Sequence, residues 1–243
     1  MKILLAGKSG SGKDYLAGLL EADGHHQLIT YTTREQRYSG ENTHIFIAPE
    51  DVDKYPERFL ETTINGHTYF ATREAVNDSD VLILDPQGIK DILKAFPDED
   101  FTVCYVMASD AKRLARMITR VVGDRIHPQD VNAMGDLFSK CFKVGDDERP
   151  YHIIRNHYCK AVPELGELVC KVFDRYVAER NLFKALEKKI EQHKFPKNVV
   201  SVSVIHNDYC QDTLVRAVYN IEEALNGKAV YNVEDSSNRP SLD

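Results

Sequence analysis

Residues 7–14 read Gly-Lys-Ser-Gly-Ser-Gly-Lys-Asp, and this stretch decides the fold. It fits the phosphate-loop pattern G-x-x-x-x-G-K-[ST] at every position except the last. An apolar strand pattern over residues 2–6 precedes it, and a helical pattern over residues 13–22 follows. In such a unit the backbone N–H groups surround a phosphate, the helix dipole adds to the attraction, and the lysine supplies a positive charge. We therefore expect the phosphates of a nucleoside triphosphate to be bound by Gly7, Ser9, Gly10, Ser11, Gly12, Lys13 and Asp14.

Position 14 carries the one departure from the pattern, because Asp14 stands where a Ser or Thr hydroxyl normally ligates Mg²⁺. A carboxylate is a harder, charged oxygen ligand, and it suits Mg²⁺ directly or through water. We therefore expect Asp14 to be a metal ligand for the Mg²⁺ that accompanies ATP. Loops that end in Gly-Lys-Asp also resemble those of some small-molecule kinases, including phage deoxynucleotide kinases and phosphomevalonate kinases.

The composition excludes several classes of protein. The chain has 243 residues, of which 42% are apolar, and this is enough for a hydrophobic core. A membrane span needs about 18 consecutive apolar residues, and the sequence has no such run. The net charge of −7 argues against general nucleic-acid binding. The five cysteines are scattered and form no CxxC pair, which favours a reducing, cytoplasmic location over a disulfide framework or a zinc site.

Strand and helix patterns alternate along the chain, and this predicts an α/β fold with a parallel core sheet and right-handed crossovers. Between the first helix and the second buried strand, residues 27–72 combine short β-type runs with turn signals, which predicts a small, mostly antiparallel insertion. The strand patterns cover residues 2–6, 81–85, 101–107, 151–156 and 199–205. The helical patterns cover residues 13–22, 87–95, 109–122, 130–143, 163–194 and 211–226.

Four separated motifs downstream of the glycine-rich loop resemble guanylate kinases, in the order found in that family. Thr32-Thr33-Arg34-Glu35-Gln36-Arg37, followed by Gly40-Glu41, resembles the segment T-T-R-x-x-R-x-G-E that holds the acceptor phosphate. Two arginines three residues apart in a turn can converge on one phosphate, and guanidinium groups match phosphate oxygens in geometry. The other three matches are Phe59-Leu60-Glu61 to F-[IL]-E, residues 66–76 to the family's G-N-Y-Y-G-T-S-K-E-A-V, and Asp85-Pro86-Gln87-Gly88 to D-x-Q-G.

The resemblance implies a set of residues for the guanine monophosphate. Glu61 and Asp85 would accept hydrogen bonds from the guanine ring, and Tyr69 would donate to the acceptor phosphate. Thr30 falls where the family has a base-contacting Ser, and His44 stands where a second phosphate-binding Tyr is usual. The complete predicted acceptor set is Thr30, Arg34, Arg37, His44, Glu61, Tyr69, Thr72 and Asp85.

Residues 109–122 carry arginines at helical spacing, and Lys112-Arg113-Leu114 resembles the start of the family's lid. Phosphoryl transfer needs charge stabilisation more than an acid or a base, so lid arginines should reach the transferred phosphate. Arg116 and Arg120 are the preferred catalytic candidates beside Lys13. Arg113 shares their face of the helix, and Arg125 lies in the same region of the chain. The family's second lid arginine has no clear counterpart in residues 130–143, and Asn156 matches a family Asn near the ATP base.

These observations predict a P-loop kinase that transfers phosphate from ATP to a nucleoside monophosphate, with GMP or dGMP as the acceptor. A broader deoxynucleoside monophosphate kinase and a non-catalytic guanylate kinase-like binding module are the alternatives. The intact loop with Lys13 argues against the module. We expect a kinase-like domain over 1–160, with the monophosphate-binding insertion at 29–75 and the lid at 110–150. Residues 161–226 would form a C-terminal extension that packs on the core, forms a homo-oligomer or binds a partner, followed by a disordered tail over 227–243.

Overall fold

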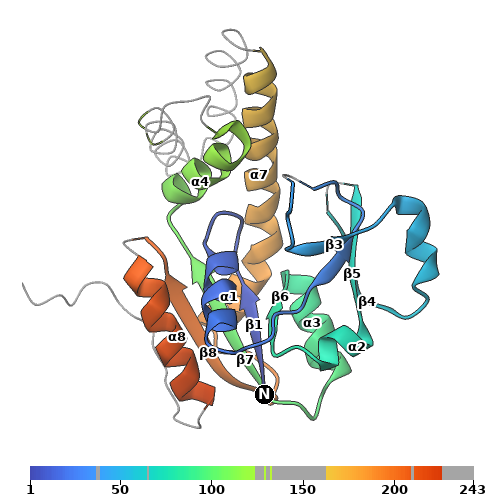
Figure 1. The fold of residues 1–243 in the computed structure, drawn as a ribbon. Helices are drawn as coiled ribbons and strands as arrows, with labels where there is room; N and C mark the ends of the chain where they lie inside the picture. Colours follow the sequence, from blue (N-terminus) through green and yellow to red (C-terminus); the bar gives the residue numbers. More distant parts are fainter. Residues whose placement is uncertain are drawn as a thin grey trace, which may run out of the picture.

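The computed structural model describes residues 1–36, 39–64, 66–123, 129, 132, 163–208 and 211–225, and these form an α/β fold with two sheets (Figure 1). Four parallel strands form the core sheet in the order β6-β1-β7-β8. The parallel core predicted from the sequence is thus confirmed. Its strands are β1 (Lys2–Ala6), β6 (Val81–Ile83), β7 (Phe101–Met107) and β8 (Val199–His206).

Helices cover both faces of the core sheet, which is why β1 and β7 are apolar and buried along nearly their whole length. On one face, Ile3 and Leu5 of β1 pack with α1 (Lys13–Ala22) and α8 (Gln211–Leu225). On the other face, Leu4 and Ala6 belong to a cluster that includes α3 (Pro86–Ala95) and the C-terminal half of α7 (Pro163–Glu191). The period-two alternation of β1 therefore assigns its side chains to two separate halves of the core.

The order of the strands reverses between β1 and β7. The chain leaves β1 and returns in β6 on one side, whereas it leaves β7 and returns in β8 on the other side. Ligands of open α/β sheets bind where the strand order reverses in this way. Residues 7–12 follow β1 directly, so the glycine-rich loop lies at this reversal point.

The second sheet lies beside the core and is mixed, as the turn-rich segment of the sequence predicts (Figure 1). Its order is β3-β2-β5-β4, in which β2 and β3 are parallel and the other pairs are antiparallel. One face carries a cluster of rings made by Tyr31, Tyr55 and Phe70. The elements of this part are β2 (Thr30–Thr32), β3 (His44–Phe46), the 3₁₀ helix η1 (Pro49–Lys54), β4 (Arg58–Ile64), β5 (His67–Thr72) and α2 (Arg73–Asn77).

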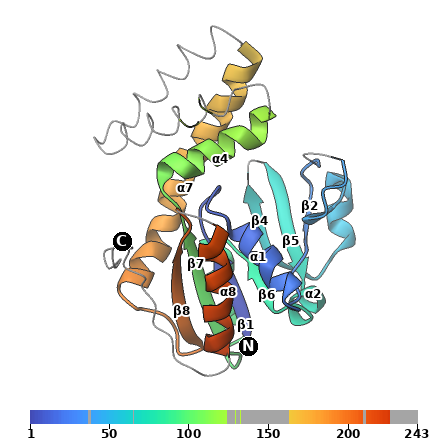
Figure 2. The same ribbon diagram turned by 60° about the vertical axis from the view of Figure 1, so that its left-hand side comes forward.

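An arm made by α4 (Asp110–Val122) and the N-terminal half of α7 extends beyond the core sheet (Figure 2). Apolar side chains spaced along one face of α4, among them Leu114 and Ile118, pack against Val169 and Phe173 of α7. Because α7 continues without a break into the core, where Phe183 and Leu186 are buried, it connects the arm to the central sheet.

The expected boundary near residue 160 does not correspond to a division of the hydrophobic core. Strand β8 pairs with β7 along its whole length, and α7 and α8 cover opposite faces of the sheet. The described residues 163–208 and 211–225 therefore contribute to the same core. Periodicity predicted these helices and this strand correctly, but strand pairing is non-local and could not be inferred from the pattern. The helix expected over 130–143, apart from residue 132, the strand expected over 151–156 and the tail over 227–243 lie outside the described residues.

Candidate functional site

The glycine-rich loop has the conformation that a phosphate-binding loop requires. Gly10 and Gly12 have φ values of 78° and 102°, in the region that favours glycine. A Cβ atom on Gly10 would lie 2.6 Å from the carbonyl oxygen of Arg113, so the packing also excludes a side chain there. Gly12 is the N-cap of α1 and has no side chain to bond the first-turn N–H groups. Those groups can therefore bind an anion at the positive end of the helix.

Side chains from distant parts of the chain hold the outer surface of the loop. Arg113 Nε donates to the carbonyl oxygen of Ser9 at 3.0 Å, and Asn207 Nδ2 donates to that of Ser11 at 2.8 Å. In a planar trans peptide the carbonyl and the following N–H point in opposite directions. Because the two carbonyls are turned outward, the N–H groups of Gly10 and Gly12 are turned toward the inside of the loop.

The side chain of Arg116 bonds to the backbone of the glycine-rich loop and of Asn207. Its guanidinium donates to the carbonyl oxygens of Gly10 at 2.9 Å and Asn207 at 3.1 Å. Burial lowers its pKa below the ordinary value for arginine. In this structure the donors of Arg116 bond to backbone carbonyls, and its role at a transferred phosphate stays a prediction. Arg120 is exposed on α4, and Arg125 lies outside the described residues.

Lys13 is half-buried at the start of α1, and Asp14 beside it is exposed. No cluster of three or more His, Cys, Asp and Glu side chains that could hold a metal ion occurs in the described part of the chain. Mg²⁺ in phosphate sites is commonly held by one or two carboxylates together with phosphate oxygens and water. The single carboxylate of Asp14 fits that kind of site, in which the nucleotide itself supplies ligands.

One face of the second sheet gathers three of the predicted acceptor residues. Thr30 is in register with His44, and Thr32 is in register with Tyr69, so alternation along the strands places Thr30, His44 and Tyr69 on the same face. Thr30 Oγ1 lies 2.8 Å from His44 Nδ1, and the ring of His44 meets that of Tyr69 edge-on at 5.6 Å between centroids. We call this set, together with Arg34, the acceptor face.

Arg34 follows β2 and lies over the ring of Phe46 of β3, with 5.2 Å from its Cζ to the ring centroid. Its terminal nitrogens donate to both oxygens of the buried Glu41, at 2.8 and 3.2 Å. Burial alone would lower the pKa of Arg34, but Glu41 and then Tyr69 outweigh it, and the pKa lies above its ordinary value. Its Nε is buried and has no hydrogen-bond partner among the described residues. Arg37 lies outside those residues.

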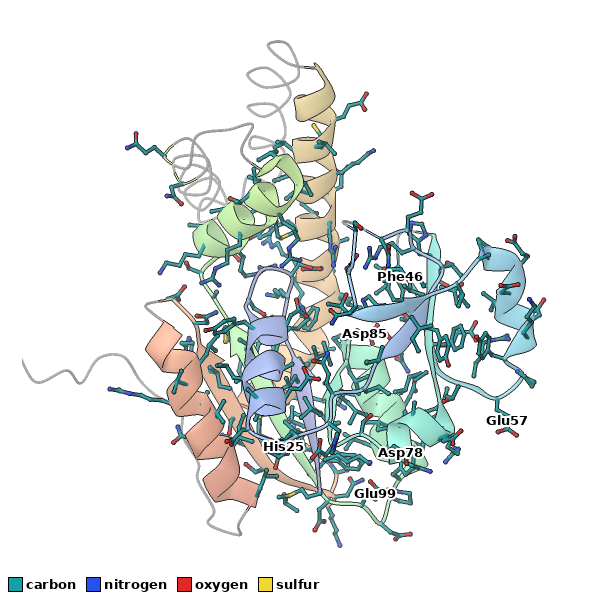
Figure 3. All side chains as sticks on the ribbon, in the orientation of Figure 1. His25, Phe46, Glu57, Asp78, Asp85 and Glu99 are labelled. Carbon is teal, nitrogen blue, oxygen red and sulfur yellow. The ribbon has the colours of Figure 1, made fainter. Side chains whose placement is uncertain are left out.

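Asp85 connects the acceptor face to the core sheet. It is the N-cap of α3, where one carboxylate oxygen accepts a hydrogen bond from the N–H of Gly88 at 2.6 Å. The other oxygen accepts from the hydroxyl of Thr62 in β4 at 3.4 Å. Asp85 follows β6 at its carboxyl end and lies between the core sheet and the second sheet. Figure 3 labels it near Phe46, which belongs to strand β3 of the second sheet. Because β6 is the neighbour of β1, the acceptor face and the glycine-rich loop adjoin the same edge of the core sheet.

Two predicted acceptor residues are not on this face. The pairing of β4 with β5 is irregular between Phe59 and Thr62, and Leu60 has a φ of 54°. At this irregularity Glu61 bonds to Arg58 at 2.7 Å, and the same arginine donates to two carbonyl oxygens of the η1 segment. Glu61 therefore lies toward η1 and away from Asp85. Thr72 is also absent from the face, because its hydroxyl accepts from the N–H of Ala75 as the N-cap of α2.

Sequence reasoning missed three residues whose side chains bond to the backbone of the loop. They are Arg113, which was expected on a basic face, Asn207 and Glu179. Asn207 follows an apolar strand directly, and polar residues at the carboxyl ends of parallel strands meet at one edge of a sheet. That signal could have found it. Asn156, the residue expected near the ATP base, lies outside the described residues. Glu179 is one charged residue among many on a long helix, and no local signal marks it.

A hollow of about 950 Å³ opens at the outer end of the second sheet, between η1 and the turn that joins β4 to β5. Among its lining residues are Arg34, Phe46, Val52 and Thr68. Its lining includes Arg34 but neither His44, Tyr69 nor Asp85, so it is not the acceptor face itself.

Comparisons with known proteins leave the family unproven. No family model and no curated protein matches the chain. Among solved structures, the guanylate kinase from Anaplasma phagocytophilum is 17% identical over 60% of this chain and 86% of its own, with a TM-score of 0.39. A TM-score this low does not establish a shared fold. No helix in the described residues is long and apolar enough to cross a membrane.

Proposed function

We propose that this protein transfers the terminal phosphate of ATP to a nucleoside monophosphate, and that the acceptor carries guanine. The observation that supports this most is that the acceptor face and the glycine-rich loop adjoin the same edge of the core sheet, joined there by Asp85 and Thr62. A phosphotransferase requires a donor site and an acceptor site that meet in this way, because positioning supplies much of the catalysis.

The described residues divide between the two substrates. Lys13 and the inward N–H groups of Gly10 and Gly12 would hold the phosphates of ATP. Arg34, which its ion pair with Glu41 holds at the acceptor face, would bind the acceptor phosphate through its guanidinium, with Tyr69 and His44 as further donors. The carboxylate of Asp85 would accept from guanine, which presents N–H donors that adenine lacks at the same edge. Mg²⁺ held with Asp14 would neutralise charge on the phosphates during transfer.

Two observations favour a second candidate, a kinase with a broader choice of deoxynucleoside monophosphates. Glu61, which the sequence resemblance assigns to guanine, is paired with Arg58 instead. The loop also ends in Asp14, as in some kinases of deoxynucleotides. If Asp85 alone forms hydrogen bonds with the base, the selectivity for guanine would be weaker.

A coupled assay with GMP, dGMP, AMP and dTMP, each with ATP and Mg²⁺, tests the proposal. We expect turnover with GMP or dGMP, and a loss of at least about 100-fold in kcat for Lys13→Ala. Similar turnover with all the deoxynucleotides tried would favour the broader kinase. Tight binding of GMP without turnover of any monophosphate would contradict the proposal and favour a binding module.

A further inference from the structure

Ser9 in the glycine-rich loop has all of its polar groups bonded to side chains of α4 and α7. Its N–H donates to Glu179 Oε2 at 2.7 Å, and its hydroxyl donates to Glu179 Oε1 at 2.5 Å. Its carbonyl oxygen accepts from Arg113, as described above. Glu179 lies on α7, so a residue far along the chain determines the position of the first half of the loop.

Glu179 is largely buried, with 13% of its side chain exposed, and its charge is balanced. Arg113 and Arg175 lie 3.3 and 3.1 Å from its two oxygens. Burial alone would raise its pKa, but the hydrogen bonds from Ser9 and the charge of Arg175 outweigh burial, and the pKa lies below the ordinary value. Glu179 is therefore ionised at neutral pH, and hydrogen bonds to an ionised acceptor are stronger than those between neutral groups.

Helix α7 contacts the loop at a second point. Lys8 forms an ion pair with Glu187 at 2.6 Å, and the hydroxyl of Tyr105 in β7 donates to the same oxygen at 2.7 Å. Glu179 and Glu187 are separated by about two turns of helix and so lie on one side of α7. Two successive loop residues, Lys8 and Ser9, are thus attached to a helix that is itself packed into the core.

We propose that Glu179 is a positioning residue for the phosphate loop. Its carboxylate holds Ser9 so that the next N–H groups, those of Gly10 and Gly12, stay directed toward a bound phosphate. Glu179 then sets the affinity for the nucleotide without touching it. The proposal rests on the proposed function only in taking the nucleotide as the ligand of the loop.

The test compares Glu179→Gln with Glu167→Gln, the same change at an exposed position on the same helix. Hydrogen exchange of the peptide that covers residues 7–13 is measured without ligand, and ADP affinity is measured by calorimetry. We expect faster exchange of this peptide and about tenfold weaker ADP binding in Glu179→Gln only, because a hydrogen bond to a charged group is lost. In steady-state assays the KM for ATP should rise while the KM for the monophosphate stays constant.

Equal loop exchange and equal ADP affinity in the two variants would overturn the proposal. If Glu179→Gln does not fold, Ser9→Ala decides instead, because it removes the hydroxyl bond without leaving a new buried charge unpaired. Unchanged exchange of the loop in Ser9→Ala would then also overturn it. If the wild-type protein binds no ADP, the proposed function fails, whereas loop exchange in the free protein still decides the role of Glu179.

Discussion

The side-chain amide of Asn207 donates to the carbonyl oxygen of Ser11, and this bond joins the end of the last core strand to the phosphate loop. A Cβ atom on Gly12 would collide with Nδ2 of Asn207, so a side chain there would displace this amide. The C-terminal part of the chain therefore supports the glycine-rich loop, whereas the sequence predicted an extension that packs on the core, forms a homo-oligomer or binds a partner.

Replacement of Asn207 by Ala should weaken nucleotide binding more than it weakens folding, because Ser11 would no longer be held. We expect ADP affinity to fall by about fivefold to tenfold, from the loss of one buried hydrogen bond. Asn198→Ala is the matched control, since Asn198 also donates to backbone carbonyls, those of Leu93 and Phe96, but lies at the opposite end of β8. Calorimetry should show an effect on ADP binding for Asn207→Ala alone. Equal losses of affinity would show that both act through stability.

Arg116 and Arg120 should respond differently to replacement by Ala. Arg116→Ala removes the donor to the carbonyl oxygens of Gly10 and Asn207, and the expected loss of stability is about 2 kcal/mol, with a higher KM for ATP. Arg120→Ala removes an exposed side chain and should leave the melting temperature nearly unchanged. If Arg120 reaches the transferred phosphate, its replacement lowers kcat. Thermal melts and steady-state kinetics separate the two effects, and an unchanged melting temperature for Arg116→Ala would contradict the anchoring role.

Base selectivity should depend on Asp85 and very little on Glu61. Asp85→Ser removes the carboxylate but keeps an oxygen that can cap α3, so the helix is retained. We expect the ratio of kcat/KM for GMP over AMP to fall by about tenfold or more in Asp85→Ser. Glu61→Ala should leave this ratio within about twofold, since Glu61 is paired with Arg58. A large loss of selectivity in Glu61→Ala would show that Glu61 turns toward the base when the monophosphate binds.

Lys2 should stabilise the fold without a role in catalysis. Its ammonium group is buried and donates to the carbonyl oxygens of Val76, Asn77 and Ser79, at 2.9, 3.0 and 2.7 Å, at the C-terminal end of α2. Lys2→Met leaves these acceptors unpaired and should cost about 2–4 kcal/mol in the free energy of unfolding. Urea unfolding measures the loss, and Lys90→Met, at an exposed position on α3, is the control. A loss below about 0.5 kcal/mol would contradict the capping role.

Asp80 should lower the free energy of unfolding as the pH becomes acidic. It accepts from the N–H of His26 at 2.6 Å and lies 2.9 Å from His25 Nδ1. Burial alone would raise its pKa, but the hydrogen bonds from His25 and His26 outweigh burial, and the pKa lies below its ordinary value. A carboxylate of this kind contributes stability above about pH 4, and the contribution disappears as the pH falls through the folded-state pKa.

Asp80→Asn should therefore be less stable than the wild type at pH 7. Because the Asp80 side chain is 38% exposed, we expect a difference of less than about 1 kcal/mol. The difference should shrink as the pH falls below about 4. Thermal melts between pH 3 and 7 measure it, with the exposed Asp98→Asn as the control. A difference that grows toward acid pH would have the wrong sign for this account.

The sequence by itself determined the local structure, including the place of the glycine-rich loop between β1 and α1. Apolar periodicity predicted β1, α1, β7 and α7, because the residues that form a buried strand or the buried stripe of a helix are close together in the sequence. The glycines of the loop are readable for the same reason, since a positive φ is a property of single positions. Matched motifs also marked Thr30, Arg34, His44, Tyr69 and Asp85, which alternation along the strands or capping of α3 brings to the space between the sheets.

Only the tertiary structure decided which partner each charged side chain meets. Arg116 reads as a lid arginine but serves the loop backbone, and Glu61 reads as a base contact but faces Arg58, because an irregularity in β4 redirects it. Glu179 and Asn207 were missed because they reach Ser9 and Ser11 across more than 150 residues, at 2.7 and 2.8 Å. Hydrogen bonds at such separations depend on how helices and strands pack, and no pattern of neighbouring residues records that packing.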